Sequence, residues 1–174
     1  AKAEAVRNVK QAGIIILGNG SNLLPLLPAR YECQLHLISK DDTPDGIHQN
    51  FALSGSHNAE NAAVAATICR YVGIKEEKIK TAILSFKGLP HRLELVASCD
   101  IAGNQLRIIN DSKATNDAAA ARALSSFQQI FWCAGGLAKE TSLPNCIKEL
   151  RQVKHAYLYG NSKTQFQSEL SGLI

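Results

Sequence analysis

The second half of the chain alternates between apolar runs and longer mixed segments, and this alternation limits the possible folds more than any other feature. The runs at 106–110, 129–134 and 155–159 predict strands, and the segments 117–125, 142–151 and 162–170 predict a helix after each of them. Strands that are joined by helices through short connections form right-handed crossovers and a parallel sheet. The sequence therefore predicts an α/β fold with a parallel sheet.

The first half predicts strands at 14–17 and 34–39 and helices at 58–71 and 76–86. Gly73 is well placed to end the first helix. The second helix has apolar residues at 79, 82, 83 and 86, the spacing of a stripe that faces a core. The Gly-Leu-Pro sequence at 88–90 breaks this helix, and a strand at 92–97 follows. We therefore predict two domains, 1–88 and 89–174.

Composition and charge argue against several classes of function. Hydrophobic residues make up 45% and charged residues 20%, as in ordinary globular proteins. No stretch reaches the roughly 18 apolar residues of a membrane helix. The net charge of +4 is spread along the chain, which suits an anionic small molecule and not nucleic acid. The five cysteines form no CxxC pair, which favours reduced thiols. We expect a cytoplasmic protein that binds neither membranes nor nucleic acid.

Polar or glycine-containing loops follow all three strands of the second half. They are Asp-Ser-Lys-Ala-Thr-Asn at 111–116, Gly-Gly-Leu-Ala-Lys at 135–139, and Gly160. Ligands of open parallel sheets bind beyond the carboxyl ends of the strands. We therefore expect the three loops to form a site on one edge.

The chemistry of the first loop suits a nucleotide or another anionic ligand. Asp111 could bind a ribose diol, and Lys113 and Thr115 could bind an anion. A simpler alternative for Asn116 or Asp117 is the N-cap of the next helix. The glycines with Lys139 have an alternative too, a flexible turn with a solvated lysine.

A second polar group opens the helix at 58–71. Asn58 and Asn61 are three residues apart and share one face of its first turn. Their carboxamides offer donors and acceptors to a purine edge, whereas N-capping explains only one of them. His57 alone is more often structural than catalytic. The sequence contains neither GxxxxGK[ST] nor GxGxxG, so no phosphate-binding loop of either type is present.

Three strings in this order resemble the Mur ligase family. They are Gly-Ser-His-Asn-Ala-Glu-Asn-Ala-Ala at 55–63, Gly-Leu-Pro-His-Arg at 88–92, and Asn-Asp-Ser-Lys-Ala-Thr-Asn at 110–116. In that family they lie at the end of the central ATPase domain, in the interdomain linker, and at the start of a Rossmann-like C-terminal domain. The third string is similar to that of the members that add D-glutamate.

The resemblance implies roles for the matching residues. Asn58 and Asn61 would contact adenine, while Arg92 and Asp111 would hold the nucleotide, Asp111 through its ribose. Lys113 would lie near the reacting phosphate and acyl groups.

Four further assignments also come from the resemblance. Thr115 and Lys139, together with the lysine near the reacting groups, would bind D-glutamate. His57 is implied as a catalytic residue. Lys2 resembles the family's carbamylated lysine that organises the metal, and an ordinary surface lysine is its alternative.

The activity implied is ATP-dependent amide formation in peptidoglycan precursor synthesis. A carboxylate of UDP-N-acetylmuramoyl-L-alanine attacks the γ-phosphate, and the amine of D-glutamate displaces phosphate from the acyl phosphate, with Mg²⁺ neutralising phosphate oxygens. Because the family's phosphate loop is absent from these residues, we expect this polypeptide alone to be inactive. Two alternatives stay open: a different Mur ligase or folylpolyglutamate-type synthetase, and a non-catalytic nucleotide-binding module.

Overall fold

The computed structural model describes residues 9, 13–18, 24–27, 33–39, 42–138 and 142–174. The chain divides into two compact units, 1–86 and 87–174, and each is described by itself. This division falls close to the boundary predicted after residue 88. Whether each unit is a domain stays a prediction. Within the described residues, no helix has both the length and the apolar character needed to cross a membrane.

Unit 1 pairs two short parallel strands and packs helices beside them. β1 (Ile14–Gly18) and β2 (Gln34–Ile38) run in the same direction, with Ile14 opposite Gln34. α2 (Ser56–Tyr71) contacts both strands and α3 (Glu76–Ser85). The buried residues of α2 are alanines, Ala62, Ala63 and Ala66, so the helix backbone can approach its neighbours closely. Unit 1 also contains the 3₁₀ turns η1 (Leu24–Leu26), η3 (Ile47–Gln49) and η4 (Phe51–Leu53).

The apolar stripe predicted on α3 is only partly buried. Ile79 is 4% exposed, whereas Ala82 is exposed and Phe86, just beyond the helix, is 40% exposed. The end of α3 is held by a polar side chain instead. Asn50 Nδ2 donates to the carbonyl oxygens of Ile83 at 2.6 Å and Phe86 at 2.8 Å, which satisfies carbonyls that the helix leaves open.

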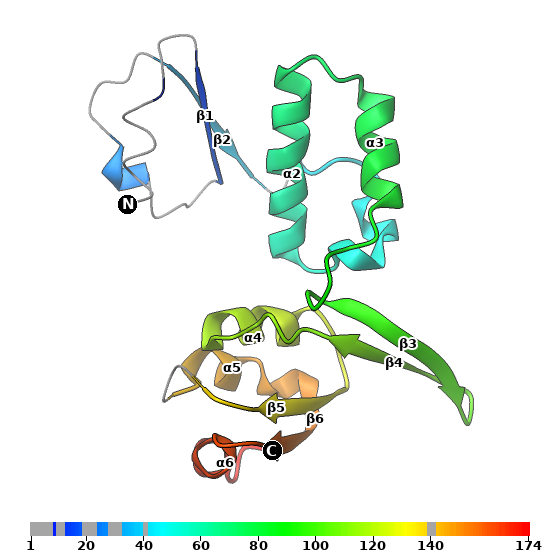
Figure 1. Ribbon diagram of the computed structural model, residues 1–174, viewed down its shortest axis with the longest axis vertical. Helices are drawn as coiled ribbons and strands as arrows, with labels where there is room; N and C mark the ends of the chain where they lie inside the picture. The colour runs from blue at the N-terminus through cyan, green and yellow to red at the C-terminus, as the bar shows by residue number, and fades with distance from the viewer. Residues whose placement is uncertain (1–8, 10–12, 19–23, 28–32, 40–41, 139–141) are drawn as a thin grey trace. The chain divides into compact units, whose positions relative to one another are not determined.

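Unit 2 contains the elements that the sequence predicted in its second half. In chain order they are β3 (Glu94–Ile101), β4 (Asn104–Asn110), α4 (Asp117–Ser125), β5 (Ile130–Gly135), α5 (Pro144–Lys148), the 3₁₀ turn η5 (Leu150–Gln152), β6 (Val153–Tyr159) and α6 (Lys163–Leu170). β5 and β6 run side by side in parallel, with Phe131 opposite His155 (Figure 1). The α/β fold with parallel pairing is therefore confirmed.

The position of β4 corrects one expectation. Instead of hydrogen-bonding to β5 or β6 in the described residues, β4 pairs with β3 in an antiparallel hairpin. Ala102 and Gly103, which connect the two strands, have φ angles of 52° and 78°. Positive φ at both central residues is the geometry of a type I′ turn, whose twist matches that of antiparallel strands. The loop after β4 therefore does not follow a strand of the parallel sheet.

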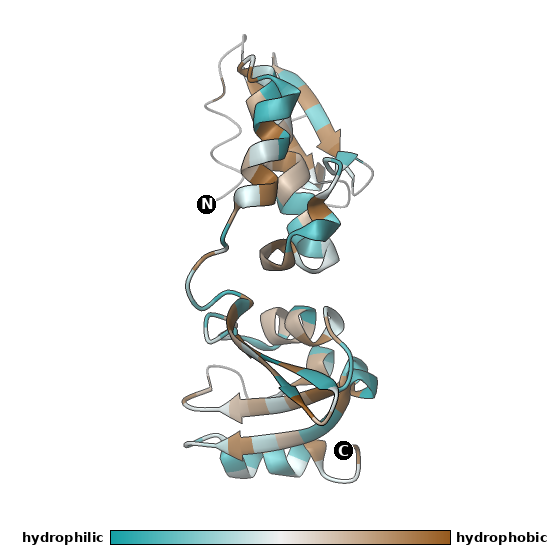
Figure 2. Cartoon of the chain, turned by 90° about the vertical axis from the view of Figure 1, so that its right-hand side faces the viewer, coloured by the Kyte–Doolittle hydropathy of each residue, from teal (hydrophilic) through white to brown (hydrophobic). Residues whose placement is uncertain are grey.

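The core of unit 2 lies between the β5–β6 sheet and the three helices. Hydrophobic residues follow one another along β5 (Figure 2). The buried cluster includes Leu124 of α4, Cys146 of α5, and Phe166 and Leu170 of α6. Full burial of a side chain such as leucine contributes about 1.5–3 kcal/mol. This packing fixes the helices on the sheet, and with them the loops at their first turns.

Candidate functional site

The loop after β4 is held at its start by the segment 91–93. The amide of Lys113 donates to the carbonyl oxygen of His91 at 3.1 Å, and the amide of Leu93 donates to Asp111 Oδ1 at 3.1 Å. Leu93 is buried, at 5% exposure. These bonds bring the backbone beside Arg92 next to Asp111, two residues that the sequence predicted to bind the nucleotide.

A network of side chains reinforces this junction. Asn110 Oδ1 accepts from the amide of Ser112 at 3.1 Å, so its Nδ2 is the atom that faces His91 Nδ1 at 2.8 Å. His91 Nδ1 therefore acts as an acceptor. Glu94 Oε2 accepts from the amide of His91 at 2.8 Å. The backbone of His91 has a φ angle of 63°, in the left-handed region that residues other than glycine rarely adopt. The network holds this residue at both its amide and its imidazole ring.

The middle of the loop is compact, and two of the residues predicted to bind ligands, Lys113 and Thr115, face solvent. The amide of Ala114 donates to the Asp111 carbonyl at 2.8 Å, and that of Thr115 to the Lys113 carbonyl at 2.9 Å. The side chains of Lys113 and Thr115 are exposed, whereas Asp111 is half-buried. Unit 2 thus brings Arg92, Asp111, Lys113 and Thr115 together on two joined segments.

Asn116 ends the loop as the N-cap of α4. Its Oδ1 accepts from the amide of Ala119 at 2.8 Å. The capping alternative considered for Asn116 or Asp117 is therefore confirmed for Asn116, and this residue is explained by helix formation.

Asp117 has a role that the sequence did not reveal. The residue is 5% exposed. One carboxylate oxygen accepts from the amide and the Nδ2 of Asn145, and the other accepts from the amide of Cys146. Burial acts to raise the pKa of Asp117, but the hydrogen bonds from Cys146 and Asn145 outweigh it and hold the pKa below its ordinary value. The buried group is thus ionised and joins the first turns of α4 and α5.

The loops after β5 and β6 are bonded to each other. The amide of Gly136 donates to the Tyr159 carbonyl at 3.1 Å. Ser162, at 5% exposure, donates its hydroxyl to the Gly136 carbonyl at 2.9 Å and accepts from the amide of Ala138 at 2.8 Å. Gly160 comes so close to Gly136 that a Cβ on it would lie 2.8 Å from the Gly136 backbone. Two of the three loops predicted to share an edge do so, and Ser162 is the joining residue that the sequence did not indicate.

Two predicted site residues, Lys2 and Lys139, lie outside the described residues. The structure therefore does not test the predicted roles of these lysines in metal organisation and in D-glutamate binding.

The residues predicted in unit 1 lie in the first turns of α2. His57 and Asn58 are half-buried, and Asn61 is exposed. Asn58 Nδ2 donates to the Ser54 carbonyl at 2.9 Å. One hydrogen of this carboxamide nitrogen is therefore engaged within the protein, and the predicted contact of Asn58 with adenine stays a prediction.

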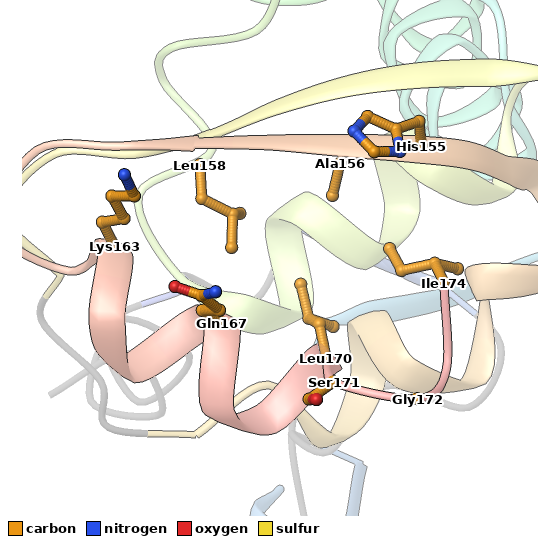
Figure 3. A pocket seen from close by; sticks show the side chains of 9 residues that line it. All are labelled: His155, Ala156, Leu158, Lys163, Gln167, Leu170, Ser171, Gly172 and Ile174. Carbon is orange, nitrogen blue, oxygen red and sulfur yellow. The ribbon is translucent and has the colours of Figure 1, made fainter.

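A hollow of about 340 Å³ lies between β6 and α6. Ala156 and Leu158 point into it from β6, and Leu170 lies opposite on α6 (Figure 3). Lys163 and Gln167 supply polar groups at its side. None of the predicted site residues that the structure describes lines this hollow. In the described part of the chain, no group of three His, Cys, Asp or Glu side chains is arranged to hold a metal ion.

Comparison with known proteins decides the family. No family model matches the chain. A UDP-N-acetylmuramoylalanine–D-glutamate ligase of Sphingopyxis alaskensis is 38% identical over 167 residues, which cover 92% of this chain and 38% of that protein. A ligase of the same name from Agrobacterium fabrum is 44% identical over 130 residues, 75% of this chain and 26% of that protein. This chain belongs to the Mur ligase family.

A solved structure supports the fold. The UDP-N-acetylmuramate–alanine ligase of Thermotoga maritima matches 68% of this chain and 28% of its own length, with a TM-score of 0.55 and 17% identity. The relatives at 38% and 44% identity confirm the family that the three strings resemble. This Mur ligase chain spans about two fifths of the Sphingopyxis relative and about a quarter of the Agrobacterium relative.

Proposed function

We propose that this chain is part of a ligase that adds D-glutamate to UDP-N-acetylmuramoyl-L-alanine, using ATP and passing through an acyl phosphate. The observation that carries the proposal is 38% identity, across 92% of the chain, to a relative named for that reaction. The proposal concerns a longer protein, because the chain spans 38% of that relative. We place the reaction in the cytoplasm and expect the 174-residue polypeptide alone to be inactive.

Four residues of unit 2 are proposed to bind the nucleotide and the reacting groups. Asp111 binds the ribose and Arg92 the nucleotide, while Lys113 stabilises the charge that develops during transfer of the phosphoryl group. Thr115 binds D-glutamate. The fixed backbone of this loop supports these roles, because Lys113 is exposed at its side chain but anchored at its amide by His91. Preorganised charges need little rearrangement during the reaction.

In unit 1, we assign adenine binding to Asn58 and Asn61. Asn58 Nδ2 is bonded to the Ser54 carbonyl, and the side-chain oxygen of Asn58 is proposed to accept a hydrogen bond from the exocyclic amine of adenine. Asn61 is exposed and lies one turn further along the same helix. His57 is proposed as a catalytic residue on the same turn.

Mg²⁺ is proposed as the metal cofactor, and when bound it would neutralise phosphate oxygens. No described residue is assigned as its ligand, since these residues form no suitable group. Lys2 stays the proposed metal-organising residue, and Lys139 a proposed D-glutamate ligand. Their tests are substitutions in the full-length protein.

The test is phosphate release by the full-length protein with ATP, Mg²⁺ and UDP-N-acetylmuramoyl-L-alanine. D-Glutamate is compared with L-lysine, meso-diaminopimelate and L-alanine. We expect stimulation by D-glutamate alone, with loss of activity in Lys113→Ala and after chelation of Mg²⁺. Lys148→Ala removes another exposed lysine of unit 2 and is the control, with activity retained. Stimulation by another amino acid would identify a different ligase, and stimulation by none would refute the proposal.

A further inference from the structure

Asp117 is a buried charge that accepts three hydrogen bonds from one short segment, Asn145 and Cys146. An ionised carboxylate is costly to remove from water unless hydrogen bonds replace its hydration. Here Oδ2 accepts from Asn145 N at 2.9 Å and Nδ2 at 2.7 Å, and Oδ1 accepts from Cys146 N at 2.9 Å. Both oxygens are therefore committed to the first turn of α5.

That first turn is itself fixed in the core of unit 2. Cys146 is 0% exposed and Leu143 is 5% exposed. The amide of Leu143 also donates to Glu169 Oε2 of α6 at 2.8 Å. Asp117 is thus bonded to a backbone that has little freedom to move.

The place of Asp117 in the chain gives this anchor a consequence for the neighbouring loop. It is the first residue of α4, directly after the cap Asn116 and two residues after Thr115. The other end of the loop is held at Asp111 and Lys113 by the segment 91–93. The exposed side chains of Lys113 and Thr115 therefore extend from a short loop that is anchored at both ends.

We infer that Asp117 is a positioning residue, which sets the place of Lys113 and Thr115 by fixing where the loop ends. It does not contact the substrate and acts through the start of α4. The inference rests on the proposed function of this loop. Without the anchor, the start of α4 would be held only by the packing of the helix in the core and by its cap Asn116, and Thr115 would be positioned less firmly. Misplacement of binding groups by about 1 Å can cost about 100-fold in rate.

The experiment uses the full-length protein and the variant Asp117→Asn. The carboxamide keeps the shape of the side chain but lacks the charge. Both oxygens of Asp117 accept from N–H donors of α5, so the NH₂ group that replaces one oxygen would face a second donor. We expect the KM for D-glutamate to rise and kcat/KM to fall at least about 10-fold. Asn145→Ala removes only the Nδ2 bond and leaves the backbone donors, so a smaller change in the same direction is expected.

Leu124→Ala is the matched control, because Leu124 is 3% exposed on the same helix but lies at its far end. It should lower thermal stability and leave kcat/KM unchanged. Hydrogen–deuterium exchange gives a readout besides activity. The amides of residues 112–116 should exchange faster in Asp117→Asn than in Leu124→Ala.

The outcomes separate the inference from the proposed function. If wild-type protein shows no release of phosphate with D-glutamate, the proposed function fails. If the wild type is active and Asp117→Asn lowers stability while keeping its kinetics and exchange rates, the inference is overturned. Should Asp117→Asn not fold, unchanged kinetics and exchange in Asn145→Ala would overturn it equally.

Discussion

Replacing Gly160 by alanine tests how closely the two loops beyond β5 and β6 approach each other. Gly160 has a φ angle of 70°, and an added Cβ would lie 2.8 Å from both the Cα and N atoms of Gly136. These are backbone atoms, so they cannot turn aside as a flexible side chain could. The substitution therefore combines a backbone strain with a steric overlap.

A second glycine of unit 2 separates these two contributions. Gly103 has a similar φ angle of 78°, but a Cβ there would meet no atom within 4 Å. Gly103→Ala should therefore cost only the left-handed strain, about 1–2 kcal/mol. Gly160→Ala should add an overpacking cost of about 1–3 kcal/mol. The gain from a stiffer unfolded chain is common to both variants and cancels in the comparison.

The measurement is urea unfolding of the chain, followed by the fluorescence of Trp132. This residue is the one tryptophan of the sequence and lies half-buried within β5 of unit 2, the unit that contains both substitutions. The difference in unfolding free energy between the variants should be about 1–3 kcal/mol, with Gly160→Ala the less stable. Equal losses in the two variants would show that the close approach of Gly160 to Gly136 is absent, and the described junction would be wrong.

Two further predictions concern single polar side chains. Asn50→Ala should lower the unfolding free energy by about 1–3 kcal/mol, because the carbonyls of Ile83 and Phe86 lose their donor. Circular dichroism during urea unfolding measures this loss. Asn104→Ala, at the exposed first residue of β4, is the near-neutral control, and equal effects of the two substitutions would contradict the reasoning. For Asp117, the folded pKa lies below the ordinary value of about 3.9. Its stabilisation is present above that value and is lost as the pH falls through the lowered pKa, so wild type and Asp117→Asn should converge in stability below about pH 4. A constant difference across that range would contradict an ionised, hydrogen-bonded carboxylate.

Local patterns were sufficient to locate most helices and strands. The run at 117–125 matches α4, and the runs at 14–17 and 34–39 match β1 and β2 to within a residue at each end. These signals depend on neighbouring residues, namely an apolar period and a capping side chain such as Asn116. The predicted helix at 142–151 is shorter in the structure, since α5 ends at Lys148 and a 3₁₀ turn follows.

Other features depend on residues distant in sequence, and local patterns were insufficient for them. The β3–β4 hairpin turns at Ala102 and Gly103, and alanine is not a residue that normally signals a positive φ angle. The stripe on α3 had the right period, but how much of it is covered depends on what packs against the helix. The spacing of apolar residues shows which face of a helix is apolar, but it does not show how much of that face is buried.

The sequence by itself determined the α/β class, the family, and the loop from Asp111 to Asn116 as the segment with the most chemistry. Those follow from contiguous residues. The tertiary structure alone decided that Asp117 bonds to a helix 28 residues further along, and that Ser162 joins the loops of two strands. An aspartate or serine has the same local pattern whether it faces solvent or a buried amide. Only the packed fold fixes which donors surround it, and therefore whether it anchors a loop.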